Sequence, residues 1–140
     1  MRRVLYNLFA LGILLTGVAG NCKKKNSGGG PVEATLAVTL NPAAGSLQLP
    51  VPQTTFPLTV TITSTMPSAG VTIDVSSKKD DGSSDPAFFT TSISTSSTTP
   101  SPFSITGTPT NVICITNVTV TSKSTPSNKW AGSYRYSRKP

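Results

Sequence analysis

Hydrophobic and polar residues alternate along most of the chain after residue 33. In residues 36–40 and again in residues 56–63, large apolar side chains recur at every second position, with Ala, Pro or Thr between them. Alternation with a period of two is typical of a β-strand that buries one face. Further segments with strand character span residues 71–75, 88–95, 103–107, 111–122 and 128–138. The pattern therefore predicts about seven strands, and no helix after residue 20.

Two of these segments depart from a simple strand. In residues 111–122 the apolar parity shifts from Ile113 and Ile115 to Val118 and Val120. A β-bulge would absorb such a shift, because one extra residue reverses the face that the following side chains occupy. Pro57 lies inside residues 56–63, and its missing N–H predicts either an edge strand or the start of a strand at that point.

Pro, Gly, Asn and Ser separate the predicted strands. Turn clusters fall at residues 41–45, 50–52, 66–70, 78–86, 96–102, 108–109 and 124–128. Short strands with turns at this spacing are the pattern of an antiparallel β-sandwich. The pattern resembles immunoglobulin-like and fibronectin type III-like domains, although the spaced Cys…Trp…Cys signature of true immunoglobulin domains is missing. We expect an all-β fold with a single immunoglobulin-like β-sandwich over residues 33–140.

The amino-acid composition limits the catalytic and metal-binding chemistry that the protein can perform. The 140 residues include 19 Ser and 22 Thr, only five acidic residues, and no His. Without His, Ser-His-Asp catalysis, Cys-His catalysis and imidazole metal sites are excluded. No nucleophile motif is present, so we expect no enzymatic activity and no cofactor. The formal net charge of +7 falls to +2 without the basic residues at positions 2, 3 and 23–25, so most of the excess lies before the domain.

The first 21 residues have the features of an export signal. Arg2 and Arg3 precede an apolar segment at residues 4–19, which is short for a membrane span, and small residues follow. Cys22 comes directly afterwards, and residues 22–32 form a tether rich in Lys and Gly. This stretch resembles the leader of bacterial lipoproteins.

The resemblance implies that Cys22 becomes the acylated mature N-terminus. A lipid anchor would then hold the protein at the bacterial cell envelope. We expect it at the outer membrane, on either the periplasmic face or the cell-surface face. The three tether lysines then either lie against anionic head groups or act as a solvated spacer. The alternative is ordinary cleavage after Ala19, which leaves a soluble periplasmic or secreted protein.

Two groups of residues in the domain are candidate sites of weak specificity. Asp80, Asp81 and Asp85 supply oxygen ligands of the kind that Ca²⁺ prefers, but a solvated turn explains the same residues. Cys114 lies between two isoleucines and is expected to be a core residue with an inert thiol.

The last predicted strand carries a third candidate. Trp130, Tyr134 and Tyr136 share one face with Gly132, which suits either stacking on a sugar or packing into the core, with the tyrosine hydroxyls at the rim. Basic residues of the same segment suit either contact with anionic envelope polymers or protection of an edge strand. The basic residues of this possible binding surface are Lys129, Arg135 and Arg138.

The sequence thus favours an envelope lipoprotein whose sandwich is a non-catalytic binding or structural module. One alternative is a fimbrial or adhesin-type assembly subunit that uses strand addition, and another is a soluble carbohydrate-binding module. Expected partners are the membrane, through the lipid anchor, and envelope polysaccharide or another envelope protein. Nucleic acid is not expected, because no nucleic-acid motif is present and an exported protein seldom meets it.

Overall fold

The computed structural model describes residues 32–140; the predicted signal peptide, Cys22 and the tether up to residue 31 lie outside the described residues. The compact unit Pro31–Pro140 contains seven strands. These are β1 (Val38–Asn41), β2 (Phe56–Ile62), β3 (Val71–Lys79), β4 (Phe89–Thr95), β5 (Ser101–Ile105), β6 (Ile113–Ser122) and β7 (Lys129–Ser137). Residues 32–140 contain no helix, so the predicted all-β class is confirmed there. In the same range no helix is long and apolar enough to cross a membrane.

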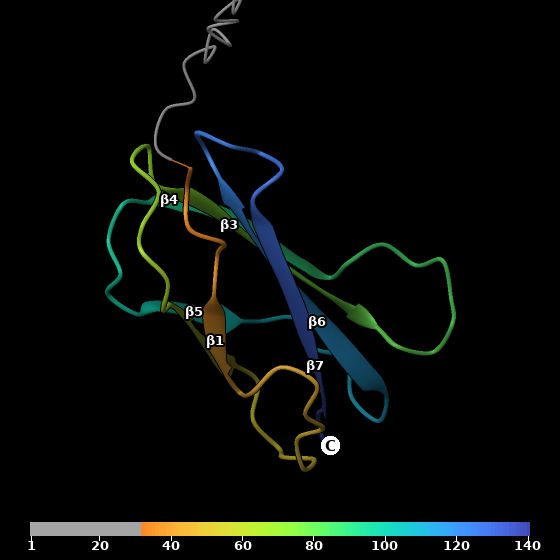
Figure 1. Cartoon of the computed structure of the whole chain (residues 1–140). Helices are drawn as coiled ribbons and strands as arrows, with labels where there is room; N and C mark the ends of the chain where they lie inside the picture. The colour runs from red at the N-terminus through yellow and green to blue at the C-terminus, as the bar shows by residue number, and fades with distance from the viewer. Residues whose placement is uncertain (1–31) are drawn as a thin grey trace, which may run out of the picture. The chain divides into compact units, whose positions relative to one another are not determined.

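The strands form two antiparallel sheets (Figure 1). One sheet has the order β1-β2-β5 and the other has the order β4-β3-β6-β7. Strands A, B and E of an immunoglobulin-like sandwich share one sheet, and strands C, F and G share the other. With β4 placed beside β3, the observed order is compatible with that arrangement. The predicted β-sandwich is therefore confirmed.

The core lies between the sheets and follows the alternation of the sequence. Each of β2 and β3 turns every second side chain inward, so that Leu58, Val60, Ile73 and Val75 are buried. The outward positions of these strands carry mainly Thr, Ser and charged residues. This is how one chain can be rich in Ser and Thr and still enclose an apolar core.

The predicted bulge in residues 111–122 is wrong. β6 pairs without interruption with β3 on one side and with β7 on the other. Its inward face is Cys114, Thr116, Val118 and Val120, while Ile113 is 46% exposed. The buried hydroxyl of Thr116 shares a hydrogen bond of 2.7 Å with Ser77 on β3, so a polar residue occupies an inward position without leaving its hydroxyl unpaired.

Pro57 lies near the start of a strand, one of the two predicted positions, and not at a sheet edge. It is the second residue of β2, the central strand of its sheet. Pairing with β1 ends at Thr59, so no β1 residue lies opposite Pro57. The missing N–H therefore removes no bond between β1 and β2.

An extended segment continues the larger sheet beyond β7. After β1, residues 45–51 run parallel to β7, with bridges from Leu47 to Arg135 and from Val51 to Arg138. The amide of Gln48 donates to the carbonyl of Arg135 at 2.8 Å. We call residues 45–51 the covering segment, because they occupy the free edge of the last strand.

A polar cluster fixes the start of the domain. The Glu33 carboxylate accepts hydrogen bonds from the hydroxyls of Ser122 and Ser124, and from the amide of Asn128. Asn128 in turn accepts a bond of 3.0 Å from the amide of Leu36. The chain therefore enters the domain beside the turn between β6 and β7, which we call the entry end.

The opposite end of β6 lies among other loops. Ile113 pairs with Ser137, and Arg138 is bridged to both Val51 and Thr110. We call this region the far end; it comprises the segment after β1, the loop before β6 and the residues after β7. Since β6 has ten residues, about 30 Å separate the two ends.

Candidate functional site

The aromatic face of β7 points into the core. Tyr134 and Tyr136 are 2% and 0% exposed. The ring of Tyr136 lies 4.5 Å from that of Phe56 and 5.7 Å from that of Tyr134, measured between centroids. These contacts are typical of aromatic packing in a core, and they leave little ring surface for a sugar.

Trp130 lies on the same face, nearer the entry end. It is partly buried and packs against the core. Its ring covers Gly132, and a β-carbon at that position would overlap it. The glycine therefore provides the space that the indole needs.

The tyrosine hydroxyls lie inside the domain, not at its rim. The hydroxyl of Tyr136 is 3.3 Å from that of Thr108, whereas the hydroxyl of Tyr134 is buried without a hydrogen-bond partner among residues 32–140. Burial raises the pKa of Tyr134 to about 12, and it also raises the pKa of Tyr136. Both phenols therefore stay protonated near neutral pH.

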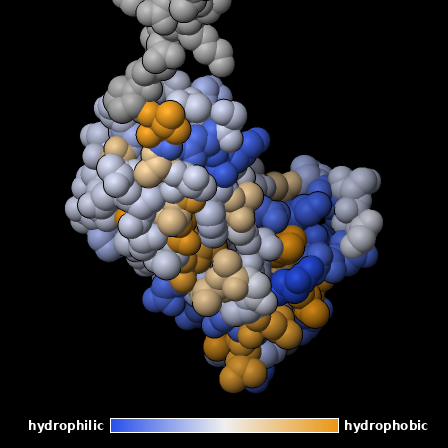
Figure 2. Space-filling view, in the orientation of Figure 1, coloured by the Kyte–Doolittle hydropathy of each residue, from blue (hydrophilic) through white to orange (hydrophobic). Residues whose placement is uncertain are grey.

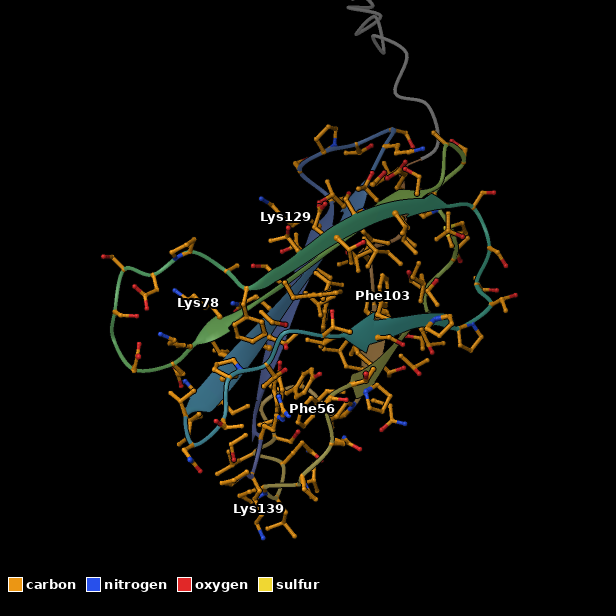
Figure 3. All side chains as sticks on the ribbon, turned by 180° about the vertical axis from the view of Figure 1, so that it is seen from behind. Phe56, Lys78, Phe103, Lys129 and Lys139 are labelled. Atoms are coloured by element: carbon orange, nitrogen blue, oxygen red, sulfur yellow. The ribbon has the colours of Figure 1, made fainter. Side chains whose placement is uncertain are left out.

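The basic residues of β7 do not share a surface with the aromatic ones. Lys129 and Arg135 alternate with the aromatic positions and point outward. Figure 3 shows Lys129 near the entry end and Lys139 at the far end. The guanidinium of Arg135 lies 2.5 Å from the carboxylate of Asp80, and Arg138 donates to the carbonyl of Thr108 at 3.3 Å. The six residues proposed as one binding surface are thus divided between two faces and two ends.

Cys114 is a core residue, as predicted. Its side chain is 0% exposed, and burial raises the pKa of its thiol to about 11. The thiolate is the reactive form, so this environment disfavours nucleophilic chemistry.

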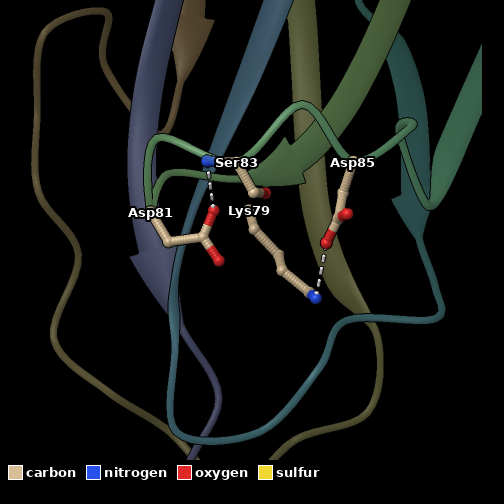
Figure 4. Close-up of polar contacts among 4 residues, drawn as sticks. All are labelled: Lys79, Asp81, Ser83 and Asp85. Carbon is tan, nitrogen blue, oxygen red and sulfur yellow. Dashed lines mark hydrogen bonds and ion pairs between the residues drawn. The ribbon is translucent and has the colours of Figure 1, made fainter.

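The three aspartates of the loop between β3 and β4 bind different partners. Asp80 pairs with Arg135. Asp85 pairs with Lys79 at 2.9 Å, as Figure 4 shows. Asp81 accepts the amide of Ser83 at 3.0 Å, and hydrogen bonds from Ser83 hold the pKa of Asp81 below its usual value. No group of three potential metal ligands comes together in residues 32–140. The loop is organised by its own turn and ion pairs.

Two hollows at the far end were not predicted from the sequence. One of about 170 Å³ lies between the covering segment and the core aromatics, with Leu49, Val51, Phe56 and Tyr134 in its wall. The other, of about 310 Å³, is lined by these residues: Pro50, Asn111, Val112, Ile113, Ser137, Arg138 and Lys139. The alternation of Leu47, Leu49 and Val51 was a signal for an extended segment there, but the flanking prolines favoured a turn.

The chain matches no protein-family model, and no curated protein and no solved structure matches it.

Proposed function

We propose that the protein is a cell-envelope lipoprotein whose immunoglobulin-like sandwich is a non-catalytic binding or structural module. The anchor would be Cys22, acylated after removal of the signal peptide. Support comes from the basic residues Arg2 and Arg3, the apolar segment and the small residues that precede this cysteine. The stretch after Cys22 is rich in Lys and Gly, which suits a flexible tether at a membrane surface.

The observation that carries this proposal is the arrangement of the two ends of the domain. Glu33 and Asn128 fix the incoming chain at the entry end. The far end lies about 30 Å away along β6 and carries loops with hollows. Binding residues are often carried on loops that a rigid scaffold holds in place. A module fixed at one end and open at the other suits recognition by a tethered protein.

The ionisable groups of the domain also fit binding better than catalysis. General acid–base catalysis needs an ionisable group that faces a pocket within hydrogen-bond reach of the substrate. In residues 32–140 the loop aspartates each face a different neighbour, and Cys114 is buried among core side chains.

The two alternatives make different structural demands. Strand addition needs a sheet that lacks a strand and an open apolar groove. Residues 32–140 supply seven strands, and the covering segment occupies the edge of β7. A carbohydrate-binding surface on β7 would need exposed rings, whereas Tyr134 and Tyr136 are buried. The covering segment occupies only the edge of β7, and β1, β5 and β4 are the other edge strands of the described sheets. Strand addition would have to use one of those three edges, and a carbohydrate surface on β7 draws no support from the buried rings.

Mass spectrometry of the mature N-terminus tests the anchor. The full chain is expressed in a bacterium, and membrane and soluble fractions are compared. The expected product begins at Cys22, carries acyl groups and sediments with the membranes. Cys22→Ser should move it to the soluble fraction, while the matched control Cys114→Ser should leave acylation unchanged. An unmodified wild-type chain beginning at Gly20 would contradict the proposal.

A further inference from the structure

Exposed aliphatic side chains gather at the far end of the domain. Leu49, Leu47 and Ile113 are 85%, 65% and 46% exposed. In Figure 2 hydrophobic surface is visible at this end, with hydrophilic residues beside it. Leu49 lines the smaller hollow, while its neighbour Pro50 lines the larger hollow together with Ile113. Leu47 precedes them on the same segment, where it is bridged to Arg135. Single exposed aliphatics are ordinary, but three in neighbouring segments at one end of a domain need an explanation.

The backbone holds these side chains in place. The covering segment carries both leucines, and its hydrogen bonds to β7 fix its direction. Pro50 and Pro52 restrict the chain immediately after Leu49. Since a restrained segment loses little conformational entropy on binding, the exposed leucines are well prepared to enter an apolar environment.

The segment that carries the two leucines is uncharged, and the hollow beside Ile113 is lined by basic residues. No charged residue occurs between Glu33 and Asp74, so the whole segment after β1 is neutral. Arg138 and Lys139 line the larger hollow beside Val112 and Ile113. In residues 32–140 neither cation lies within 4.0 Å of a carboxylate, and the Nε of Arg138 is buried without a hydrogen-bond partner.

Two of the acidic residues near this end are paired with cations, while Asp81 is bound by the amide of Ser83. Asp80 lies beside Ile113 through a backbone hydrogen bond of 2.8 Å, but its carboxylate binds Arg135. Asp85 binds Lys79. The cations that adjoin the exposed aliphatics are therefore left to attract an anionic partner.

We propose that the far end docks on an anionic lipid bilayer, with Leu47, Leu49 and Ile113 entering the interface and Arg138 and Lys139 facing the head groups. Projecting aliphatics next to basic residues are the combination that binds such membranes, through buried apolar area and attraction to anionic lipid. The inference rests on the proposed function only in treating the domain as a binding module. It does not depend on acylation of Cys22.

Co-sedimentation with lipid vesicles tests the inference. The chain from residue 22 onward, with Cys22→Ser so that it carries no lipid, is mixed with vesicles of phosphatidylcholine alone or with phosphatidylglycerol added. Binding is expected with the anionic vesicles and should weaken as salt is raised. The three tether lysines contribute to every variant alike, so comparisons among variants isolate the domain.

Matched substitutions at the two ends locate the contact. Leu49→Ser should weaken binding to anionic vesicles about tenfold, and Lys139→Gln about fivefold. Val32 is 97% exposed next to Glu33, so Val32→Ser is the aliphatic control at the entry end. Lys129→Gln is the charge control, and both controls should bind as the parent does.

Three results would overturn the inference. They are equal binding to neutral and anionic vesicles, equal loss in the control variants, and a dimer in sedimentation equilibrium that Leu49→Ser dissolves. The last result would assign the far end to a second copy of the chain. Acylation is measured separately, so an unmodified Cys22 together with selective vesicle binding would remove the anchor and leave this inference standing.

Discussion

At the residue scale, Cys114 shows how burial alone sets the chemistry of a side chain. Two isoleucines flank it in the sequence, and strand alternation turns both of them away from the face on which the cysteine lies. The thiol is enclosed by the core, where a thiolate would lose its hydration. The sequence predicted this environment because β6 is too apolar to leave both faces in water.

The buried thiol should react slowly with Ellman's reagent. In the mature chain with Cys22→Ser, a pKa of about 11 instead of 9.0 lowers the thiolate fraction about 100-fold at pH 8. We expect labelling in the folded state to be at least that much slower than in urea. Fast labelling without denaturant would contradict the burial of Cys114.

Glu33 shows the opposite case, a surface group whose role the sequence did not reveal. Hydrogen bonds from the side chains of Ser124 and Ser122 hold the pKa of this carboxyl below its usual value. These partners lie about 90 residues further along the chain. No local pattern links the groups, so only the folded chain brings them together.

The Glu33 cluster should make stability depend on acidic pH. Because the folded state lowers the pKa, the carboxylate stabilises the fold above the unfolded value of about 4.3, and this contribution is lost as pH falls through the folded pKa. Glu33→Gln should therefore lower the melting temperature at pH 7 and have little effect near pH 2. Thermal unfolding followed by circular dichroism measures the difference. An equal difference at both pH values would argue against a role of the charge.

At the element scale, β7 combines an aromatic inner face with a basic outer face. The period of two predicted that Trp130, Tyr134 and Tyr136 lie together and apart from Lys129 and Arg135. It did not decide whether the aromatic face is buried, because a strand at the end of a sheet can bury either face. Packing of Tyr136 against Phe56 on the opposite sheet decides this.

The two tyrosines of β7 should respond oppositely to loss of their hydroxyls. Tyr136→Phe removes a contact with Thr108 and should destabilise the fold by about 1 kcal/mol. Tyr134→Phe removes a buried hydroxyl without a partner and should stabilise it by about 1 kcal/mol. Urea unfolding followed by Trp130 fluorescence compares the two variants. Destabilisation of similar size in both would contradict the assigned partners.

The hydrophobic pattern of β6 does not predict which face of this strand is buried. Its sequence offered two apolar parities, and isoleucine is more apolar than the Cys and Thr that the core accepts. Neighbouring strands impose one continuous register, so the polar Thr116 turns inward beside Ser77 and Ile113 turns outward. The sequence of β6 alone cannot show that Thr116 will lie beside the hydroxyl of Ser77 on β3.

At the scale of the whole molecule, the covering segment completes the larger sheet. Its residues follow β1, which belongs to the other sheet, and they pair in parallel with β7 near the end of the chain. The chain thereby joins both sheets early in its course and covers an edge that would otherwise invite pairing with other chains.

Interrupting the covering segment should weaken the domain and expose that edge. Gln48→Pro removes the amide that donates to Arg135, and we expect a loss of about 1 kcal/mol together with self-association. Light scattering and thermal unfolding measure both effects. Gln48→Ala keeps the amide and serves as the control, and it should remain monomeric and close to wild-type stability. Two variants that behave alike would show that the bond to Arg135 contributes little.

The sequence by itself determined the all-β class and the number and approximate positions of the strands. These depend on local alternation and on turn residues, which act over a few positions along the chain. The tertiary structure alone decided which parity of β6 is buried, where Glu33 binds, how residues 45–51 cover β7, and which exposed side chains meet at the far end. Each of these depends on contacts between residues distant in sequence, whose partners are chosen by how the two sheets pack.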